Sequence, residues 1–391
     1  MRAHLFLPAL LSLAACRPAD IVCPTTPSPL PKAATFPRMS TLPDPFTYLD
    51  GTSRVKTKEE WYKCRQPEIL KFLQEYQYGY YPDHSAETVT ATRSGNSVSI
   101  SVSAGGKTGS FKATINLPSG ASSMAPAPVV ISIGGMDNAA YLRQGISVVT
   151  FDYTTVSPDS NGKYGAFWAL YNGRDIGVLT AWAWGFHRVL DALILTAPEI
   201  DSTKVGVTGC SRLGKAALAA GLFDTRITLT MPMSSGIQGL GPYRYTSLSG
   251  QGETLENSKS GAGWWSNSGL GTFVNKAEQL PFDAHTIAAA IAPRALVMDQ
   301  GQSDPYVNSK GTAIVVYPAA QLVYKWLGVP DMIALGIRSG GHCDNSGYTN
   351  ILPYVLKQFK GAATTRNYND LSPWTAMTTA YPWSSQIPAA S

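Results

Sequence analysis

The sequence predicts a doubly wound α/β fold, a three-layer sandwich in which a mostly parallel sheet lies between two layers of helices. Two observations predict it. Six short, nearly continuous apolar runs follow Pro128, and helical segments separate them. Runs of this kind are typical of parallel strands that are buried on both faces, and their alternation with helices favours one layered α/β domain. The 391 residues contain no internal repeat and no linker, which also favours a single domain.

Each expected element follows from its local pattern. Residues 57–82 carry apolar side chains three and four positions apart, which predicts a helix, and residues 88–118 alternate with period two, which predicts antiparallel strands. The expected parallel strands are 128–135, 145–153, 204–209, 227–235, 294–301 and 332–341. The main helices expected between them are 175–196, 212–223 and 312–327.

The two ends of the chain differ from the middle. Residues 1–16, "MRAHLFLPALLSLAAC", combine one arginine with a short apolar run that ends in small residues, so we expect a secretory signal peptide. Alternatively, Cys16 belongs to a bacterial lipoprotein box. The single domain is expected over 17–361, beginning with a Pro- and Thr-rich arm, and 362–391 is expected to be a polar, loosely packed tail.

Composition excludes several classes of function. Charged residues make up 15% of the chain, and the formal net charge of +5 is spread along it without a block of like charges. This argues against a nucleic-acid partner. No segment after the signal peptide is expected to cross a membrane. We therefore expect a secreted, extracellular and monomeric protein.

The stretch "VGVTGCSRLGK", residues 205–215, places Ser211 between an apolar strand and a helix. This is the position of the nucleophile in the elbow of α/β-hydrolases. Gly209 stands two residues before the serine, but the second glycine, Gly214, comes three residues after it instead of two. The alternative is a serine that caps a helix after a glycine turn.

A histidine and an acid complete the expected triad. The chain order in this fold is serine, acid, histidine, and of five histidines only His342, in "SGGHCDN", follows a final strand. His342 would take the proton from Ser211 and return it to the leaving alcohol. Asp304 lies just past a late strand and is the expected acid, whereas Asp299 lies within that strand. Alternatively, Asp304 initiates a turn before proline.

The cysteines are consistent with export. An oxidising compartment favours two disulfides among the four cysteines after the signal peptide. Cys210 precedes the expected nucleophile and Cys343 follows the expected base, so this pair, if formed, would clamp the two loops together. Cys23–Cys64 would then pin the N-terminal arm to the first helix. Alternatively, Cys210 and Cys343 are buried free thiols.

Five stretches resemble one known family. They are "LPDPFTYLDGTSRVKTKEEWYKCR", "GAFWALYNGRDIGVLTAWAWGFHRVLDAL", "VGVTGCSRLGK", "IAPRAL" and "GGHC". They resemble the glucuronoyl esterases, carbohydrate esterase family 15, and look most like its fungal branch, over most of residues 23–361. The resemblance implies an α/β-hydrolase fold without metal or organic cofactor. It also implies cleavage of esters between 4-O-methyl-glucuronic acid on xylan and alcohols of lignin.

The resemblance also implies roles for residues around the serine. Arg212 would donate to the oxyanion, together with its backbone N–H. Lys215, one helical turn beyond the serine, and Glu253 in "GQGETL" would hold sugar hydroxyls. Trp264 and Trp265 would line the cleft, although two tryptophans could equally be packed structure. Lys215 could alternatively be a solvated helix residue.

The chain departs from the fungal pattern at the acid and in the sugar site. Fungal relatives carry a glutamate after the strand that follows the elbow, and Ser234 stands there in this chain. Many bacterial members place their acid where Asp304 stands. Tyr306 takes the place of a tryptophan that stacks on the sugar, and Gly261 takes the place of a second fungal glutamate.

Three functional readings follow. The first is a secreted serine esterase that acts on glucuronoxylan and lignin–carbohydrate esters. The second keeps the mechanism but changes the substrate to another carbohydrate ester or an aryl ester. The third is an inactive carbohydrate-binding relative with a broken triad. An acid beside His342 would separate the first two readings from the third.

Overall fold

The structure is a computed structural model that describes residues 21–249 and 252–389. The predicted signal peptide, 1–16, lies outside the described residues. The described part contains one nine-stranded sheet with the strand order β1-β2-β3-β5-β4-β6-β7-β8-β9. Pairs from β1 to β5 along this order are antiparallel, and all pairs from β5 to β9 are parallel. The predicted doubly wound, mostly parallel sheet is confirmed.

All predicted strands form, with small shifts at their ends. The antiparallel strands are β1 (Thr88–Ser94), β2 (Ser97–Ala104) and β3 (Lys107–Asn116). The parallel strands are β4 (Ala127–Ser132), β5 (Ser147–Phe151), β6 (Ile200–Cys210), β7 (Leu229–Met233), β8 (Ala295–Gly301) and β9 (Ile333–Arg338). Three of the six, β4, β7 and β8, consist of buried residues, and so does the stretch of β6 before Cys210, which explains their continuous apolar runs.

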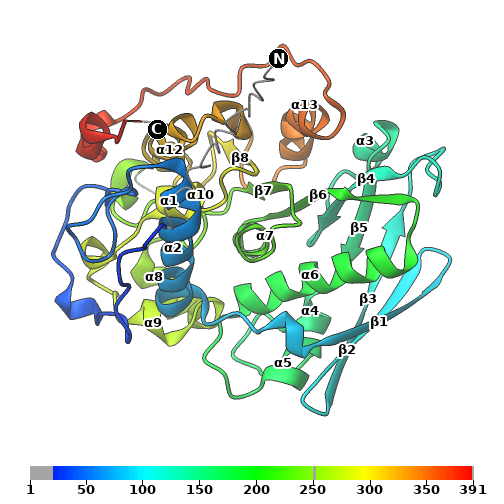
Figure 1. Cartoon of the computed structure of the whole chain (residues 1–391). Helices are drawn as coiled ribbons and strands as arrows, with labels where there is room; N and C mark the ends of the chain where they lie inside the picture. The colour runs from blue at the N-terminus through cyan, green and yellow to red at the C-terminus, as the bar shows by residue number, and fades with distance from the viewer. Residues whose placement is uncertain (1–20, 250–251, 390–391) are drawn as a thin grey trace, which may run out of the picture.

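Helices cover both faces of the sheet (Figure 1). On one face α3 (Asn138–Arg143) and α13 (Ser346–Lys360) pack over β4, β5 and β7–β9 through one apolar cluster. On the other face lie α6 (Val178–Thr196), α7 (Arg212–Phe223), α10 (Ala284–Ala289) and α12 (Tyr317–Trp326). The remaining helices are α1 (Lys58–Glu60), α2 (Gln66–Leu73), α4 (Tyr153–Val156), α5 (Ala166–Tyr171), α8 (Leu255–Ala262), α9 (Ser268–Gly271) and α11 (Ser309–Gly311).

The central helix α6 is apolar on almost every side. By length and composition it is the one helix among the described residues that could cross a membrane, but 83% of its apolar window is buried inside the domain. A helix that is apolar all round is typical of a protein core as well as of a membrane span. Its contacts with α7, β1 and β6 account for this composition.

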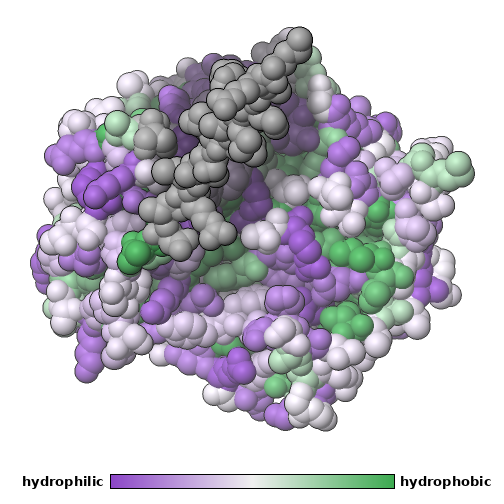
Figure 2. All heavy atoms as spheres, in the orientation of Figure 1, coloured by the Kyte–Doolittle hydropathy of each residue, from purple (hydrophilic) through white to green (hydrophobic). Residues whose placement is uncertain are grey.

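The surface mixes polar and apolar side chains. On the face shown in Figure 2, hydrophobic residues form small groups that hydrophilic residues separate. Large exposed apolar side chains among the described residues are few and scattered, as in Val22, Met124 and Ile194. Single apolar residues of this kind are normal on a protein surface.

The C-terminal segment packs more tightly than its polar sequence predicts. Trp383 is 6% exposed, and its ring lies 5.8 Å from the ring of His285 and 6.3 Å from that of Phe46. The carbonyl of Tyr368 accepts a hydrogen bond from the N–H of Leu335 in β9. The expected loose tail is therefore wrong, because a few aromatic side chains spaced along a polar segment anchor it to the core.

Candidate active site

Ser211 occupies a sharp turn between β6 and α7. Its backbone has φ 59° and ψ −129°, a conformation that residues with a side chain rarely adopt. Its N–H donates to the carbonyl of Met233 in β7 at 2.9 Å, and its carbonyl accepts from the N–H of Lys215 at 3.0 Å. Because the sheet and the helix hold both sides of the turn, Ser211 stays in this strained position. The predicted strand–serine–helix elbow is present.

The structure also explains the displaced second glycine. A Cβ on Gly209 would lie 2.6 Å from the carbonyl oxygen of Leu213, and a Cβ on Gly214 would lie 2.9 Å from the carbonyl oxygens of Gly209 and Met233. The helix thus packs against the strand through Gly214, three residues after the serine. Leu213, two residues after the serine, instead lies against Gly134.

His342 and Asp304 lie together at the carboxyl end of the sheet. Nδ1 of His342 lies 2.8 Å from Oδ2 of Asp304. The other oxygen of Asp304 accepts from the N–H groups of Tyr306 and Val307, at 2.9 and 3.1 Å, and the Asp304 side chain is fully buried. Burial raises the pKa of Asp304, but the hydrogen bonds from His342 and the backbone outweigh it and hold that pKa below its usual value. A carboxylate that accepts from Nδ1 leaves Nε2 of His342 free to accept a proton.

The other acid candidates are placed differently. Asp299 lies within β8, as expected, where its two oxygens accept from Nε of Arg338 and Nδ2 of Asn350 at 2.9 and 2.8 Å. Burial raises the pKa of Asp299. Ser234 is buried at the end of β7, and its hydroxyl has no hydrogen-bond partner among the described residues. Asp304 is therefore the carboxylate that the structure brings to His342.

Ser211 and His342 open into one cavity of about 630 Å³. Within the described residues no hydrogen bond joins the Ser211 hydroxyl to His342, a contact that often forms only with substrate. The cavity is lined by Ser211, Arg212, Gly252, Glu253, Asn257, Ser258, Gly261, Ala262, Trp264, Trp265, Pro305, Tyr306 and His342. It holds eight of the residues that the sequence singled out, whereas Lys215 and Asp304 lie behind its wall.

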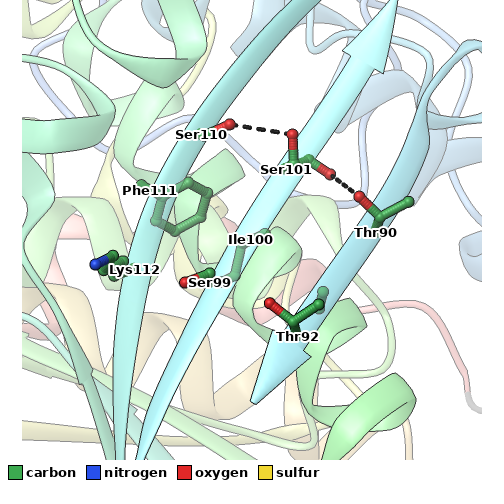
Figure 3. Close-up of a pocket in the computed structure, with 9 residues that line it drawn as sticks. Thr90, Thr92, Ser99, Ile100, Ser101, Ser110, Phe111 and Lys112 are labelled. Carbon is green, nitrogen blue, oxygen red and sulfur yellow. Dashed lines mark hydrogen bonds between the residues drawn. The ribbon is translucent and has the colours of Figure 1, made fainter. Parts of the chain in front are cut away.

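A second depression, of about 350 Å³, lies on the outer face of β1–β3 (Figure 3). Serine and threonine side chains form a ladder across it; for example, the hydroxyls of Ser101 and Ser110 lie 3.0 Å apart. Lys112 is its one ionisable side chain. The lining of this depression contains no histidine and no carboxylate, whereas the cavity at Ser211 contains His342 with Asp304 behind it. The cavity at Ser211 is therefore the candidate active site.

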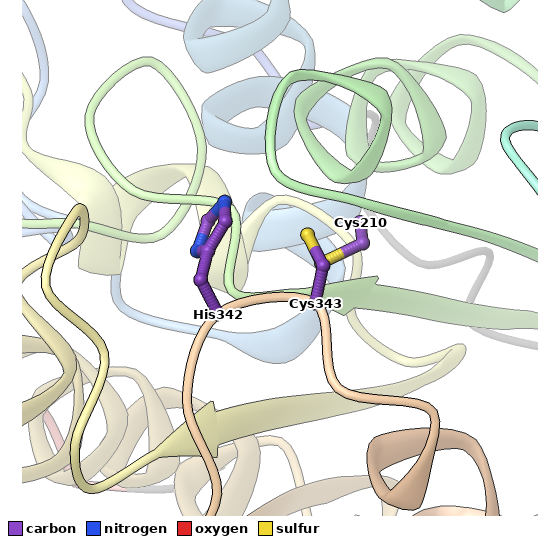
Figure 4. Close-up of side chains that lie close together, drawn as sticks. All are labelled: Cys210, His342 and Cys343. Carbon is purple, nitrogen blue, oxygen red and sulfur yellow. A yellow bond between two sulfur atoms is a disulfide. The ribbon is translucent and has the colours of Figure 1, made fainter.

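A disulfide joins the serine turn to the histidine loop (Figure 4). Cys210 and Cys343 are bonded, with their Cα atoms 5.6 Å apart, and the second disulfide is Cys23–Cys64. Ligand-type atoms of Cys210, His342 and Cys343 lie within 4.8 Å of one another. The two sulfurs are not thiolate ligands, because they are bonded to each other. Both expected pairings are present in the structure, and the free-thiol alternative is wrong.

We expect loss of this disulfide to loosen the histidine loop. The double substitution Cys210→Ser with Cys343→Ser should lower the free energy of unfolding by about 2–4 kcal/mol and also lower kcat. Thermal unfolding and ester hydrolysis would measure the two effects. The matched control is Cys23→Ser with Cys64→Ser, which should cost similar stability but leave kcat unchanged. An equal loss of kcat in both double variants would contradict the clamp.

Lys215 lies beneath the cavity, fully buried, and not in solvent or on the cavity wall as expected. Its ammonium donates to the carbonyls of Ser235 and Ile237 and to Oε2 of Glu253, at 2.8, 2.7 and 2.6 Å. Burial lowers the pKa of Lys215, and the Glu253 charge opposes this. Gly236, with φ 58°, makes room for the carboxylate, since a Cβ there would lie 2.3 Å from Oε2. Lys215 thus orients Glu253, which faces the cavity.

Arg212 and the two tryptophans share one partner that the sequence analysis missed. Asp159 accepts the indole N–H groups of Trp264 and Trp265 on Oδ1, at 2.8 and 2.7 Å. Its Oδ2 lies 2.6 Å from Nε of Arg212. Asp159 lies in the loop "SPDSNG" after α4, where an aspartate reads as an ordinary turn residue. No spacing in the sequence connects it with Arg212.

Tyr306 lies at the rim of the cavity beside the histidine. It is 64% exposed, and its ring packs edge-on against His342 with the centroids 5.0 Å apart. Its side chain is thus available to a ligand from the solvent side. Gly261 lines the same cavity, at the position where the resemblance implies a glutamate. The space beside it is open, because no atom lies within 4 Å of where a Cβ would stand.

Comparison with known proteins finds similar sequences and similar folds. The family model "Glucuronyl esterase, fungi" matches residues 100–328. The chain is 41% identical to the 4-O-methyl-glucuronoyl methylesterase of Podospora anserina over 284 residues, which are 70% of this chain and 57% of that one. A family 15 glucuronoyl esterase from Caldicellulosiruptor kristjansonii superposes with a TM-score of 0.81 and 36% identity, covering 89% of this chain and 97% of that one. A serine-to-alanine mutant of the glucuronoyl esterase from Sporotrichum thermophile, solved in complex with methyl 4-O-methyl-β-D-glucopyranuronate, has a TM-score of 0.81 and 30% identity, covering 91% of this chain and 97% of that one.

Proposed function

The chain belongs to the glucuronoyl esterases, carbohydrate esterase family 15 of the carboxylic ester hydrolases, and from this premise we propose that it is a serine esterase that cleaves esters of glucuronic acid. The observation that carries the proposal is the hydrogen bond between Asp304 and His342. This hydrogen bond orients His342 as the base for Ser211, and both residues line the same cavity. A relative that only binds carbohydrate would need no such pair.

In the first half-reaction, Oγ of Ser211 attacks the ester carbonyl while Nε2 of His342 takes its proton. Asp304 keeps the proton on Nδ1 and stabilises the imidazolium that forms. Collapse of the tetrahedral intermediate releases the alcohol, which receives the proton from His342. In the second half-reaction, His342 activates a water that hydrolyses the acyl-enzyme and frees the uronic acid and Ser211.

Arg212 stabilises the negative charge on the carbonyl oxygen in both half-reactions. It follows the nucleophile directly and lines the same cavity, and 41% of its side chain is exposed there. A preset donor at the oxyanion typically contributes about 10²–10³ in rate. Residues 134–138, a second place where hydrolases of this fold set a donor, do not line the cavity.

The opposite wall suits the sugar of a uronate ester. Glu253 uses Oε2 for Lys215 and for the N–H of Ile237, which leaves Oε1 to accept from sugar hydroxyls. Trp264 and Trp265 offer apolar surface, and Tyr306 can pack on the sugar ring from the rim. The complex of the Sporotrichum enzyme with a methyl glucuronate supports this class of ligand.

The remaining parts of the proposal concern the natural setting. We propose that the acid is (4-O-methyl-)glucuronic acid on glucuronoxylan, that the alcohol comes from lignin, and that the chain works outside the cell as a monomer. The two disulfides support an oxidising compartment.

A second candidate keeps the mechanism and changes the substrate. Gly261 leaves open space where the resemblance implies a glutamate, and the ring of Tyr306 is exposed at the rim. Both features favour a bulkier carbohydrate ester or an aryl ester.

Hydrolysis of benzyl glucuronate, compared with an acetylated xylooligosaccharide and a feruloyl ester, tests these alternatives. We expect kcat/KM for benzyl glucuronate to exceed the other two at least tenfold, because only the uronate places its ring hydroxyls against Glu253. A preference for the feruloyl or acetyl ester would support the second candidate. No hydrolysis of any of the three would overturn the esterase proposal.

A further inference from the structure

We propose that Asp159 is a positioning residue that fixes the oxyanion arginine, Arg212, and the tryptophan wall, Trp264 and Trp265, relative to one another. This inference rests on the proposed function, since it assigns Arg212 the role described above. Asp159 itself does not line the cavity and touches no reacting atom. It acts through three side chains that do.

The geometry divides the Asp159 carboxylate between two tasks. Oδ1 accepts both indole N–H groups, at 2.8 and 2.7 Å, and Oδ2 pairs with Nε of Arg212 at 2.6 Å. These three contacts are the interactions that Asp159 makes with described residues. All three partners line the cavity, so Asp159 acts on the cavity through Arg212, Trp264 and Trp265.

Arg212 needs a fixed partner because much of its side chain is exposed. It is 41% exposed, and an exposed arginine samples many rotamers unless something holds it. Nε of Arg212 lies 2.6 Å from Oδ2 of Asp159 but makes no hydrogen bond, so the carboxylate restrains the guanidinium by charge and close contact. Both terminal nitrogens remain unoccupied by Asp159. Those nitrogens can then point at the developing oxyanion.

The negative charge of Asp159 disfavours the negative charge that develops on the oxyanion. We expect this repulsion to be smaller than the benefit of holding Arg212 in place. The Asp159 side chain is 24% exposed, so solvent screens its charge over the distance to the reacting carbonyl. The ion pair with Arg212 is direct. We therefore expect removal of the carboxylate to slow catalysis.

Two substitutions separate the tasks. Asp159→Asn keeps an oxygen that can accept both indole N–H groups but replaces the anion facing Arg212 with an amide N–H₂ donor. Asp159→Ala removes the partner of all three side chains. The first variant should disturb the transition state alone, and the second should also disturb the wall against which the sugar binds.

The test is steady-state hydrolysis of benzyl glucuronate by the full chain, with glucuronate binding measured by calorimetry. In Asp159→Asn we expect kcat to fall about tenfold, less than the loss of a whole oxyanion donor, with KM within twofold of wild type. In Asp159→Ala we expect the same fall in kcat and a rise of several-fold in KM and in the Kd for glucuronate. The matched control is Asp152→Asn, in which the N-cap of α4 changes in the same region without a contact to the cavity.

The outcomes distinguish the inference from the proposed function. Wild-type kcat in Asp159→Asn would overturn the inference while the esterase proposal stands. Equal kinetics in the Asn and Ala variants, accompanied by an equal drop in Tm, would show a merely structural role and would also overturn it. If the wild type binds glucuronate but cleaves no ester, the esterase proposal fails, and the oxyanion half of the inference fails with it. The tryptophan half then survives only if Asp159→Ala weakens glucuronate binding more than Asp159→Asn does.

Discussion

Ser211→Ala should lower kcat for benzyl glucuronate by about 10⁶-fold, the loss seen when a serine hydrolase loses its nucleophile. Among the described residues, the other serine that lines the cavity is Ser258, whose hydroxyl accepts a hydrogen bond from Nε2 of Gln238 and makes none to a histidine. The variant should still bind glucuronate, because Glu253 and the tryptophans are untouched. Hydrolysis and calorimetry would measure the two properties separately.

Ser234→Ala is the control for this substitution. It removes another serine hydroxyl at the carboxyl end of the sheet, and Ser234 Oγ has no partner among the described residues. We expect wild-type kcat in this variant. Retention of activity in Ser211→Ala would show that the nucleophile lies elsewhere or that a water attacks directly.

Asp304→Asn should lower kcat by about 10³–10⁴-fold. An asparagine at this place can present an N–H to Nδ1 of His342, which favours the tautomer with the proton on Nε2 and leaves no base for Ser211. The two backbone N–H groups that bind Oδ1 hold the side chain in place, so the fold should survive. A rate profile on benzyl glucuronate, with circular dichroism to confirm the fold, would measure this effect.

The same carboxylate makes stability depend on pH. Hydrogen bonds hold the pKa of folded Asp304 below its unfolded value in spite of burial. Its contribution to stability is therefore complete above the unfolded pKa and is lost as the pH falls through the lowered folded value. The difference in Tm between wild type and Asp304→Asn should shrink over that acid range.

Asp344→Asn is the matched control for the acid. Asp344 lies in the same loop as His342, is 46% exposed and binds the N–H of Ser346, without a contact to His342. We expect wild-type kcat in this variant. Activity that survives in Asp304→Asn would exclude Asp304 as the partner of His342 and would require another acid.

The sequence predicted the fold and the reacting groups because both depend on local order along the chain. Buried parallel strands leave continuous apolar runs, and Ser211 and His342 each follow such a run directly. Asp304 could be found in the same way, since it lies just past β8. Positions at the carboxyl ends of parallel strands meet at one edge of the sheet, so these three residues come together once the strand order is right.

The supporting residues could not be found in this way, because tertiary packing alone pairs them. Helical spacing placed Lys215 on the same face as Ser211 but did not show its depth, and the side chain proved to be buried against the turn at Ser235. Asp159 lies far from Arg212 and Trp264 along the chain and resembles a common turn residue. Such partners leave no periodic or spacing signal in one sequence.

The packing of Trp383 against Phe46 bears on the order in which the core can form. The two residues lie far apart along the chain, so their contact closes a very long loop. Contacts of this kind carry a large loop-closure entropy and raise the contact order of the fold. We therefore expect this side of the core to form late in folding, after the local pairs of strand and helix.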